Sequence, residues 1–198
     1  AVVAYWHASP TDQAHRIFES VSAGHWWGTM MSEPGSGGDL GKTRTTAQPD
    51  GAQFLLSGDK HFGSGSGQTS FMVTTAKTGN AVELFVIDMR GKDWEGNEGL
   101  SLLREWDGHG MTATQSHAFR LHHCPAVKAD SGQPFAQAMN QTSSISGVLF
   151  CAVIVGVLDE AFGYALTRLR GKVDGMRALE RVEMVRAQNE HWQATTLY

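Results

Sequence analysis

The chain has 198 residues, of which 41% are hydrophobic and 18% are charged. This composition is typical of one folded domain or two small ones, and it excludes an intrinsically disordered chain. The 16 basic and 20 acidic residues give a formal net charge of −4, without any block of Lys or Arg, so we expect no nucleic acid partner. The two cysteines, Cys124 and Cys151, exclude a disulfide framework and a Cys-rich zinc site. We therefore expect no metal and a reducing, cytoplasmic location.

Residues 1–27 predict a short helical piece. Ser9 and Pro10 are typical of a helix start, with Ser9 as the N-cap, and Gly24 is typical of a helix end. Between them apolar residues recur at helical spacing, at Ala14, Ile17, Phe18 and Val21. The apolar segment Ala1–Trp6 lacks the basic residues and the length of a secretory signal.

Residues 28–128 predict an all-β domain. Short runs rich in Thr, Val and Phe alternate with Gly, Asn and Asp, which favours a barrel or a sandwich. The expected strands are 28–33, 43–48, 53–56, 60–64, 70–77, 81–89, 100–105 and 114–122. The segments Pro49–Gly51 and Thr78–Asn80 are predicted hairpin turns.

Residues 129–198 predict helices. We expect one over Ile145–Arg170 and a second over Met176–Tyr198, with a break at Gly171–Gly175. The uncharged run Ile145–Leu158 has 14 residues, fewer than the ~18 needed to cross a bilayer. It therefore predicts a buried core helix and no membrane span.

The three zones together predict an α+β, multidomain fold. A central β-barrel over 28–128 is flanked by the end of an N-terminal helical domain over 1–27. The first part of a C-terminal helical domain, a helix-bundle portion, follows over 129–198. Such a set of elements leaves large apolar faces uncovered. We therefore expect these residues to belong to a longer chain or to pack on copies of themselves.

Three sequence patterns argue against common sites. The segment Ser36–Thr43 misses the P-loop pattern G-x-x-x-x-G-K-[ST] at its first position, and a β-like segment follows it. No G-x-G-x-x-G opens a helix, which argues against a classical dinucleotide-binding fold. His122, His123 and Cys124 are adjacent on a predicted strand, so neighbouring side chains should point to opposite faces and not share a metal ion.

Two segments carry the functional signal. In Met30–Asp39 a strand runs into a Pro-Gly break and a glycine loop, whose N–H groups can approach a ligand closely. In Leu56–Gly65 an aromatic side chain, Phe62, and a hydroxyl, Ser64, are two residues apart on one strand face. An aromatic can stack on a flat ring while the hydroxyl bonds its edge. Two hairpins with glycine turns explain the same spacing equally well.

The sequence resembles the acyl-CoA dehydrogenase superfamily in four segments, in the family's order. Ser32–Asp39 is similar to T-E-P-G-x-G-S-D, and Leu56–Ser64 is similar to L-N-G-x-K-x-[WF]-I-[TS]. Trp106–Ser116 is similar to the L-G-M-R-x-[ST]-x-[ST] strand, and Leu158–Leu166 to the first long helix of the C-terminal domain. The resemblance covers roughly residues 9–198.

The resemblance implies a flavoprotein that binds FAD between a middle barrel and C-terminal helices. The positions it implies for the cofactor are Met30, Met31, Ser32, Gly37, Gly38, Phe62, Gly63 and Ser64. Among them, Phe62 would pack on the isoalloxazine ring, Ser64 would lie near its N5 and Ser32 would bond the pyrimidine side. The positions it implies for the substrate are Gly38, Thr142 and Ser143.

The reaction implied is α,β-dehydrogenation of an acyl-CoA in fatty acid metabolism. The catalytic residue is unknown, because the family's usual base, a late Glu, is expected beyond Tyr198. The alternative base position is Thr142, whose side chain cannot remove the proton. The sequence also has Thr112 where the family has Arg, and it lacks the Arg-x-x-Phe-Gly flavin-phosphate motif.

Two other functions remain open. The segment Lys60–Gly65 is at least as similar to the K-H-F-x-S-G of the flavin-dependent monooxygenase branch, the dibenzothiophene monooxygenase type. Those enzymes use reduced flavin, FMN included, and O2. The third alternative is a non-catalytic relative, a scaffold that kept the barrel and lost the chemistry. The partners implied are an acyl-CoA or another small molecule, a homodimer or homotetramer of the chain, and an electron-transfer flavoprotein.

Overall fold

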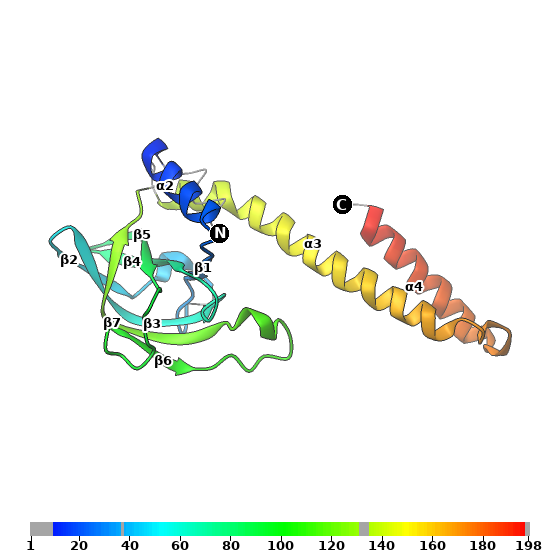
Figure 1. Cartoon of the computed structure of the whole chain (residues 1–198). Coiled ribbons are helices and arrows are strands. Elements are labelled where there is room, and N and C mark those ends of the chain that lie inside the picture. The colour runs from blue at the N-terminus through cyan, green and yellow to red at the C-terminus, as the bar shows by residue number, and fades with distance from the viewer. Residues whose placement is uncertain (1–9, 37, 131–134, 197–198) are drawn as a thin grey trace. The chain divides into compact units, whose positions relative to one another are not determined.

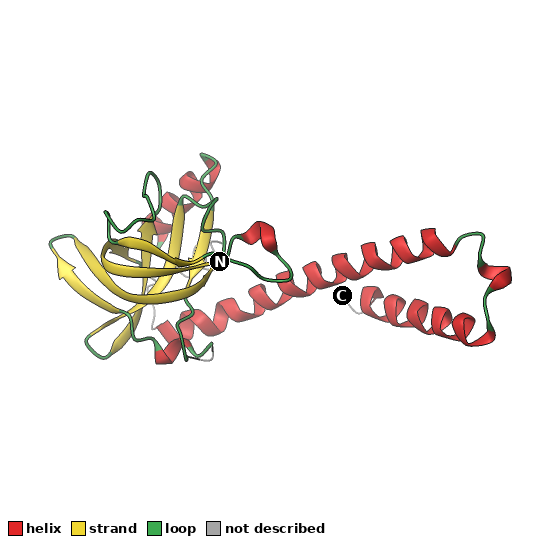
Figure 2. Ribbon diagram, turned by 90° about the horizontal axis from the view of Figure 1, so that it is seen from below, coloured by secondary structure: helices red, strands yellow, loops and turns green. Residues whose placement is uncertain are grey.

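The structure is a computed structural model of the chain. It describes residues 10–36, 38–130 and 135–196, except for the side chains of Thr11 and of residues 135–146. The chain divides into two compact units, residues 1–142 and residues 143–198. Figure 1 labels the elements of both units, and Figure 2 separates helices from strands by colour.

The first unit is built on a seven-stranded sheet. Its strands are β1 (Trp27–Met30), β2 (Thr46–Asp50), β3 (Gln53–Gly63), β4 (Phe71–Thr78), β5 (Ala81–Asp88), β6 (Leu100–Arg104) and β7 (His117–Lys128). The pairings run β4–β2–β3–β7–β5 and return from β5 to β4, so these strands close into a barrel. β1 adds to β4 in parallel, and β6 adds to β7 antiparallel. The predicted fold class, a central β-barrel with flanking helical parts, is confirmed.

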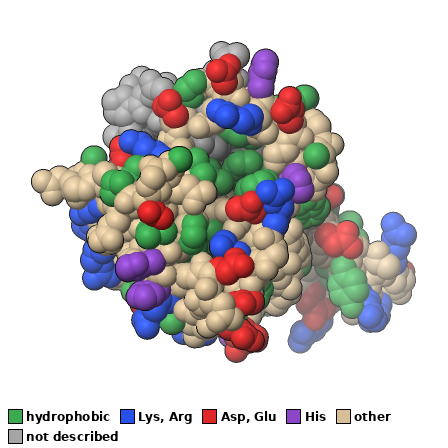
Figure 3. Space-filling view, turned by 60° about the vertical axis from the view of Figure 1, so that its left-hand side comes forward, with side chains coloured by type: hydrophobic (Ala, Val, Ile, Leu, Met, Phe, Trp, Pro, Cys, Tyr) green, Lys and Arg blue, Asp and Glu red, His purple; other side chains and the backbone are tan. Residues whose placement is uncertain are grey.

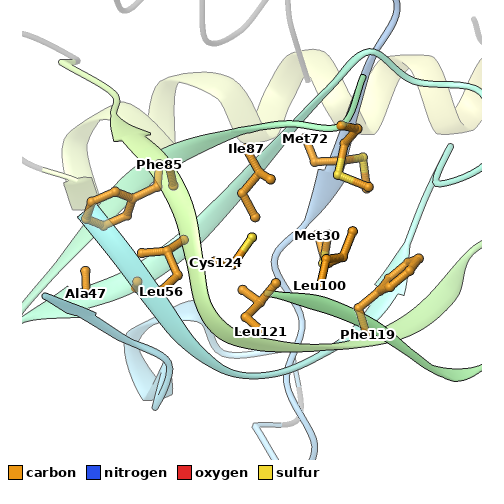
Figure 4. Close-up of a cluster of buried hydrophobic side chains, with 13 residues drawn as sticks. Met30, Ala47, Leu56, Met72, Phe85, Ile87, Leu100, Phe119, Leu121 and Cys124 are labelled. Atoms are coloured by element: carbon orange, nitrogen blue, oxygen red, sulfur yellow. The ribbon is translucent and has the colours of Figure 1, made fainter. Parts of the chain in front are cut away.

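Alternate strand residues fill the barrel with apolar side chains. Phe85, Phe119, Leu56 and Met72 have no exposed surface, and Figure 4 shows side chains of this cluster converging from several strands. Burial of this apolar surface is the main stabilising contribution to the barrel, at about 25 cal/mol per Å². Cys124 belongs to the same cluster, and burial raises the pKa of its thiol to about 11, so it packs as a small apolar residue.

The predicted hairpin turns are confirmed, but two predicted strands are one. The pairs Asp50–Gln53 and Thr78–Ala81 leave two-residue connections at both turns. The expected strands over 53–56 and 60–64 join into β3, which continues through Gly58. A Cβ at Gly58 would lie 2.8 Å from the Thr45 Cα. The glycine therefore allows close backbone approach inside a strand and does not end it.

The last strand differs most from its prediction. β7 begins at His117, not at residue 114, and continues past His122 to Lys128. His123 has a φ of 55°, and the β3–β7 register shifts at this point, which indicates a β-bulge. The rings of His122 and His123 consequently lie 4.7 Å apart, tilted by 31°. The expectation that they point to opposite faces was wrong, because it assumed regular alternation.

Helix α2 (Thr11–Ser22) packs on the outside of the barrel. Ile17 is its buried contact, in a cluster with Val73 and Leu84, and the Trp27 indole N–H donates to Ser20 Oγ at 3.1 Å. Pro10 occupies the N-cap position; the predicted N-cap, Ser9, lies outside the described residues. The helix ends before Gly24, whose φ of 85° confirms it as the stop.

The second unit contains a helical hairpin. Helix α3 (Phe135–Leu169), which begins in the first unit, continues here, and helix α4 (Ala178–Thr196) follows after a 3₁₀ turn at Val173–Gly175. Within this unit Asp159 Oδ1 and His191 Nε2 are 2.9 Å apart, and the ring of Phe162 stacks on His191 at 4.5 Å. α3 begins ten residues before the predicted Ile145, and α4 begins two residues after Met176.

The apolar part of α3 is exposed in this chain. Val148, Ile154 and Val157 are each at least 64% exposed, so the run that predicted a core helix is not buried by the described residues. Residues Gly147–Leu169 are long and apolar enough to cross a membrane, with a mean hydropathy of 1.8. Length and composition alone are weak grounds for a span, because core helices of soluble proteins share them.

Charged side chains of both signs are mixed on the face of the molecule shown in Figure 3. Hydrophobic side chains gather in a recess near the middle of this face, with Lys, Arg, Asp and Glu around them. Arg90 lies 4.8 Å over the ring of Phe71 and is paired with Asp88 at 2.6 Å. Interspersed charges of this kind are typical of a solvated surface.

Candidate functional site

The end of β3 lies alongside β1 and the turn that follows it. Thr29 bridges to Ser64, and Ser32 bridges to His61, where the His61 N–H donates to the Ser32 carbonyl at 2.8 Å. The two sequence segments that carried the functional signal are therefore neighbours in the fold. Gly28 permits this approach, because a Cβ there would overlap the Ser64 carbonyl oxygen and lie 2.5 Å from Met72 Sδ.

A buried ion pair fixes the turn after β1 to the barrel. Lys60 Nζ lies 2.8 Å from Glu33 Oε1, and neither side chain has more than 3% of its surface exposed. Lys60 also donates to the Thr75 carbonyl at 2.6 Å and to Thr75 Oγ1 at 3.2 Å. A buried charge needs such partners, because an unpaired one costs several kcal/mol.

The carboxylate of Glu33 is saturated with donors. Its Oε2 accepts from the Arg44 N–H at 2.6 Å, and its Oε1 accepts from the Thr45 N–H at 3.1 Å and the Thr45 hydroxyl at 2.6 Å. Burial alone would raise the pKa of Glu33, but the hydrogen bonds from Lys60, Thr45 and Arg44 outweigh it and lower that pKa. Burial lowers the pKa of Lys60 despite the attraction of Glu33. We assign this pair a structural role, since both side chains are almost fully buried and their charges are paired with each other.

Phe62 presents its ring outward. The side chain is 54% exposed, and its ring makes an edge contact with Trp106 at 6.0 Å. Its backbone has a φ of 54°, a conformation that costs a non-glycine residue about 1–2 kcal/mol. Strain of this kind at an exposed aromatic residue is a pointer to a binding site.

Ser64 is exposed and belongs to a chain of hydroxyl groups. Its Oγ lies 3.1 Å from Ser116 Oγ, which lies 2.8 Å from Thr114 Oγ1. The Thr114 hydroxyl donates to the Met111 carbonyl at 2.7 Å. The Gly65 N–H donates to the Thr114 carbonyl at 2.7 Å, so the loop before β7 is held against the end of β3.

The structure places the other predicted cofactor residues as follows. Met30 is fully buried in the barrel cluster, so its side chain faces the core. Met31 and Ser32 are half-buried in the turn. Gly63 is buried, and a Cβ at this position would lie only 2.8 Å from Ser66 Oγ. Gly38 is exposed, with a φ of 83°.

Three predicted positions have no described side-chain environment. Gly37 lies outside the described residues, and Thr142 and Ser143 lie in the part of α3 whose side chains are not described. Their predicted cofactor and substrate contacts stay predictions. Among the described residues no three His, Cys, Asp or Glu side chains are grouped to hold a metal ion.

Sequence reasoning missed three residues beside this face. Trp106, Thr114 and Ser116 all lie within the segment that resembled the family's L-G-M-R-x-[ST]-x-[ST] strand, but nothing in the sequence placed them against Phe62 and Ser64. Their contacts join residues that are 44 and 52 positions apart. The paired hydroxyls of that motif were the signal that could have indicated a role beside Ser64.

The chemistry of this face fits a flat heteroaromatic ring. Phe62 provides an exposed aromatic surface for packing, and the exposed Ser64 hydroxyl provides a hydrogen-bonding group at its edge. The Ser32–Pro34 turn is anchored to β3 by the Glu33–Lys60 ion pair and by the bridge from Ser32 to His61, the residue before Phe62. A neutral ring of this kind can be bound by packing and hydrogen bonds alone, without a charged side chain to pair with it.

Residues 28–124 match the family model described as the acyl-CoA dehydrogenase middle domain. The chain belongs to the acyl-CoA dehydrogenase superfamily. It is 29% identical over 162 residues to the mitochondrial short-chain specific acyl-CoA dehydrogenase of Sus scrofa. The aligned region covers 71% of this chain and 38% of that protein. The chain thus spans well under half the length of the curated relatives it matches.

Solved structures share the fold of this superfamily member. FMN-bound TdsC from Paenibacillus sp. A11-2 has a TM-score of 0.70 at 19% identity, covering 88% of this chain and 48% of that one. The methanesulfinate monooxygenase MsuC from Pseudomonas fluorescens has a TM-score of 0.61 at 17% identity. The superposition covers 84% of this chain and 42% of that one. Members of the superfamily bind flavin: FAD in the acyl-CoA dehydrogenases and FMN in some structural neighbours.

Proposed function

We propose that this protein is a flavin-dependent oxidoreductase that dehydrogenates an acyl-CoA thioester at its α and β carbons. The observation that carries the proposal is the pair of bridges, Thr29–Ser64 and Ser32–His61. They bring the turn after β1 beside the exposed Phe62 ring and the exposed Ser64 hydroxyl. Family membership supports the flavin, and the curated acyl-CoA dehydrogenase relatives support the substrate class.

The residues of this face would bind and orient the cofactor. A bound flavin would supply the acceptor for the two electrons and the hydrogen that leave the β-carbon. Phe62 would pack against the ring, Ser64 would hold the edge that carries N5, and Ser32 would bond the pyrimidine side. Gly38 lacks a side chain and leaves space for the thioester. The α-proton goes to a carboxylate that we place beyond Tyr198, because Thr142 cannot accept it.

We further propose FAD as the cofactor, a homodimer or homotetramer as the working form, and an electron-transfer flavoprotein as the electron acceptor. A cytoplasmic location completes the proposal. Cofactor identity is checked by releasing the flavin with heat and separating FAD from FMN by chromatography. The oligomer is checked by light scattering on the purified protein.

The test of the proposed reaction is an anaerobic titration of the flavin-loaded protein with acyl-CoA thioesters. The proposal predicts that the flavin absorbance near its visible maximum is bleached and that an enoyl-CoA appears in equal amount. A protein that stays colourless with added FAD and FMN would instead support the non-catalytic relative. A flavin that binds but is not bleached by any acyl-CoA would contradict the dehydrogenase.

A monooxygenase is the second candidate, and two observations favour it. The segment Lys60–Gly65 reads K-H-F-G-S-G, and the barrel and helices share their fold with a protein described as a monooxygenase. Such a reaction needs no base for an α-proton, which agrees with the presence of Thr142, a residue that cannot act as a base, at the alternative base position. The discriminating experiment supplies reduced flavin and O2 in place of an acyl-CoA. Substrate turnover under those conditions only would establish the monooxygenase and overturn the dehydrogenase.

A further inference from the structure

Ser64, Ser116 and Thr114 form a chain of hydroxyl groups at the end of β3. Counting their hydrogens shows which hydroxyl donates in each contact. The Met111 carbonyl can only accept, so the Thr114 hydroxyl uses its single hydrogen to bond it at 2.7 Å. In the 2.8 Å contact between Thr114 and Ser116 the hydrogen must then come from Ser116. In the 3.1 Å contact between Ser116 and Ser64 it must come from Ser64.

The exposed side of Ser64 is therefore an acceptor. Its hydrogen points inward to Ser116, and the nearest other internal acceptor, the Phe62 carbonyl at 3.5 Å, would also draw it inward. Only lone pairs remain for a group outside the protein. For Ser64 to donate outward, Ser116 would have to turn its hydrogen to Ser64 and give up its bond to Thr114.

We infer that Ser116 and Thr114 orient the Ser64 hydroxyl as an outward acceptor, so that this face holds reduced flavin more tightly than oxidised flavin. The inference rests on the proposed placement of flavin N5 at Ser64. Oxidised N5 carries a lone pair and needs a donor, whereas reduced N5 carries a hydrogen and needs an acceptor. Ser116 and Thr114 are positioning residues, because they act through Ser64 and not on the ring.

The consequence is a raised flavin midpoint potential. Reduction adds two electrons and one proton at N5, and the preset acceptor favours the product of that step. Removing the restraint frees the Ser64 hydrogen to bond oxidised N5. One hydrogen bond changes an equilibrium by about 2- to 10-fold, and the preference for reduced over oxidised flavin should fall by that factor.

Four variants separate this role from a merely structural one. Ser116→Ala removes the acceptor for the Ser64 hydrogen. Thr114→Val frees the Ser116 hydrogen to bond Ser64, so both substitutions should have the same direction. Thr114→Ser keeps the hydroxyl and should behave as the wild type. Ser101→Ala removes a hydroxyl on β6 that does not belong to the Ser64–Ser116–Thr114 hydrogen-bond chain, and it is the matched control.

The experiment measures the flavin midpoint potential of each flavin-loaded protein by anaerobic titration with dithionite against a reference dye. Ser116→Ala and Thr114→Val should lower the potential, while Thr114→Ser and Ser101→Ala should leave it unchanged. Circular dichroism and thermal unfolding report whether each variant is folded. Bound flavin with an unchanged or raised potential in Ser116→Ala would overturn the hydroxyl relay alone. A wild-type protein that binds neither FAD nor FMN would overturn the proposed function together with it.

Discussion

Glu33 and Lys60 lie 27 positions apart in the sequence and form a buried ion pair with a separation of 2.8 Å. One residue belongs to the turn after β1 and the other to β3, two residues before Phe62. The pair therefore joins the two segments that make the candidate site. Its burial and its position between the two segments indicate that the Lys and the Glu hold the candidate site together.

Lys60→Met should destabilise the barrel strongly. The substitution leaves the Glu33 charge buried without its ionic partner, which costs about 3–5 kcal/mol of unfolding free energy. Urea unfolding at neutral pH measures this loss. The double variant Glu33→Gln with Lys60→Met should recover part of it, because the remaining Gln is neutral and Thr45 can still donate to its carbonyl oxygen.

The control for that prediction is the exposed pair Arg120–Asp59, with a separation of 2.8 Å. Arg120→Met should change the unfolding free energy far less than Lys60→Met, since water replaces the lost partner. Equal losses in the two variants would show that burial of the Glu33–Lys60 pair has no energetic consequence.

The contribution of Glu33 should disappear in acid. Its pKa in the folded protein is lowered from the ordinary value of 4.5, so the unfolded chain binds the proton more readily. The stabilisation is complete above about pH 4.5 and is lost as the pH falls through the lower, folded pKa. The stability difference between the wild type and Glu33→Gln should shrink as the pH falls below about 4.5, through the lowered pKa of the folded state. A difference that stays constant would contradict the lowered pKa.

The Phe62 side chain should lower the stability of the folded protein through its strained backbone and strengthen flavin binding through its ring. Phe62→Ala and Phe62→Gly both lose the ring, but only glycine adopts a φ of 54° without strain. The glycine variant should be more stable to urea than the alanine variant by about 1 kcal/mol. Both should bind FAD and FMN more weakly than the wild type in a fluorescence titration. Unchanged flavin affinity would remove Phe62 from the site.

Gly28→Ala should separate β1 from the end of β3. The added Cβ would overlap the Ser64 carbonyl oxygen and approach Met72 Sδ to 2.5 Å, and such overpacking costs about 1–3 kcal/mol. Thermal unfolding measures the loss, and flavin affinity should fall with it because Ser64 moves. Gly110→Ala is the control, since a Cβ there meets open space. A Gly28→Ala protein as stable as the control would contradict the close approach.

Most of the barrel could be predicted because alternating apolar residues and two-residue turns are local signals. The errors lie where a local signal had a non-local cause. The strands predicted over 53–56 and 60–64 left Gly58 between them, yet this glycine lies inside β3 and allows close packing on Thr45. The strand predicted over 114–122 stopped short of the bulge at His123 and of Pro125, yet β7 continues through both. The start of α3 was missed because its first ten residues are mostly small and polar.

The candidate site was only partly accessible from the sequence. The sequence paired Phe62 and Ser64 as residues on one strand face, but β3 ends at Gly63 and Phe62 has a φ of 54°. Both side chains are exposed, yet regular strand alternation is not the reason. Glu33 and Lys60 stood in separate motifs, and no pattern in either segment indicated that they touch. Ser116 reaches the site through the β3–β7 pairing, and Trp106 through the β6–β7 pairing and its N–H bond to His117 Nδ1. Both depend on strand registers that the sequence did not determine.

The most direct test of the central claim is a crystal structure of the protein with its flavin bound. The account predicts that the isoalloxazine ring packs on Phe62 beside the Ser32–Pro34 turn, with N5 about 3 Å from Ser64 Oγ. A flavin bound elsewhere, or a ring whose N5 edge faces away from Ser64, would contradict it.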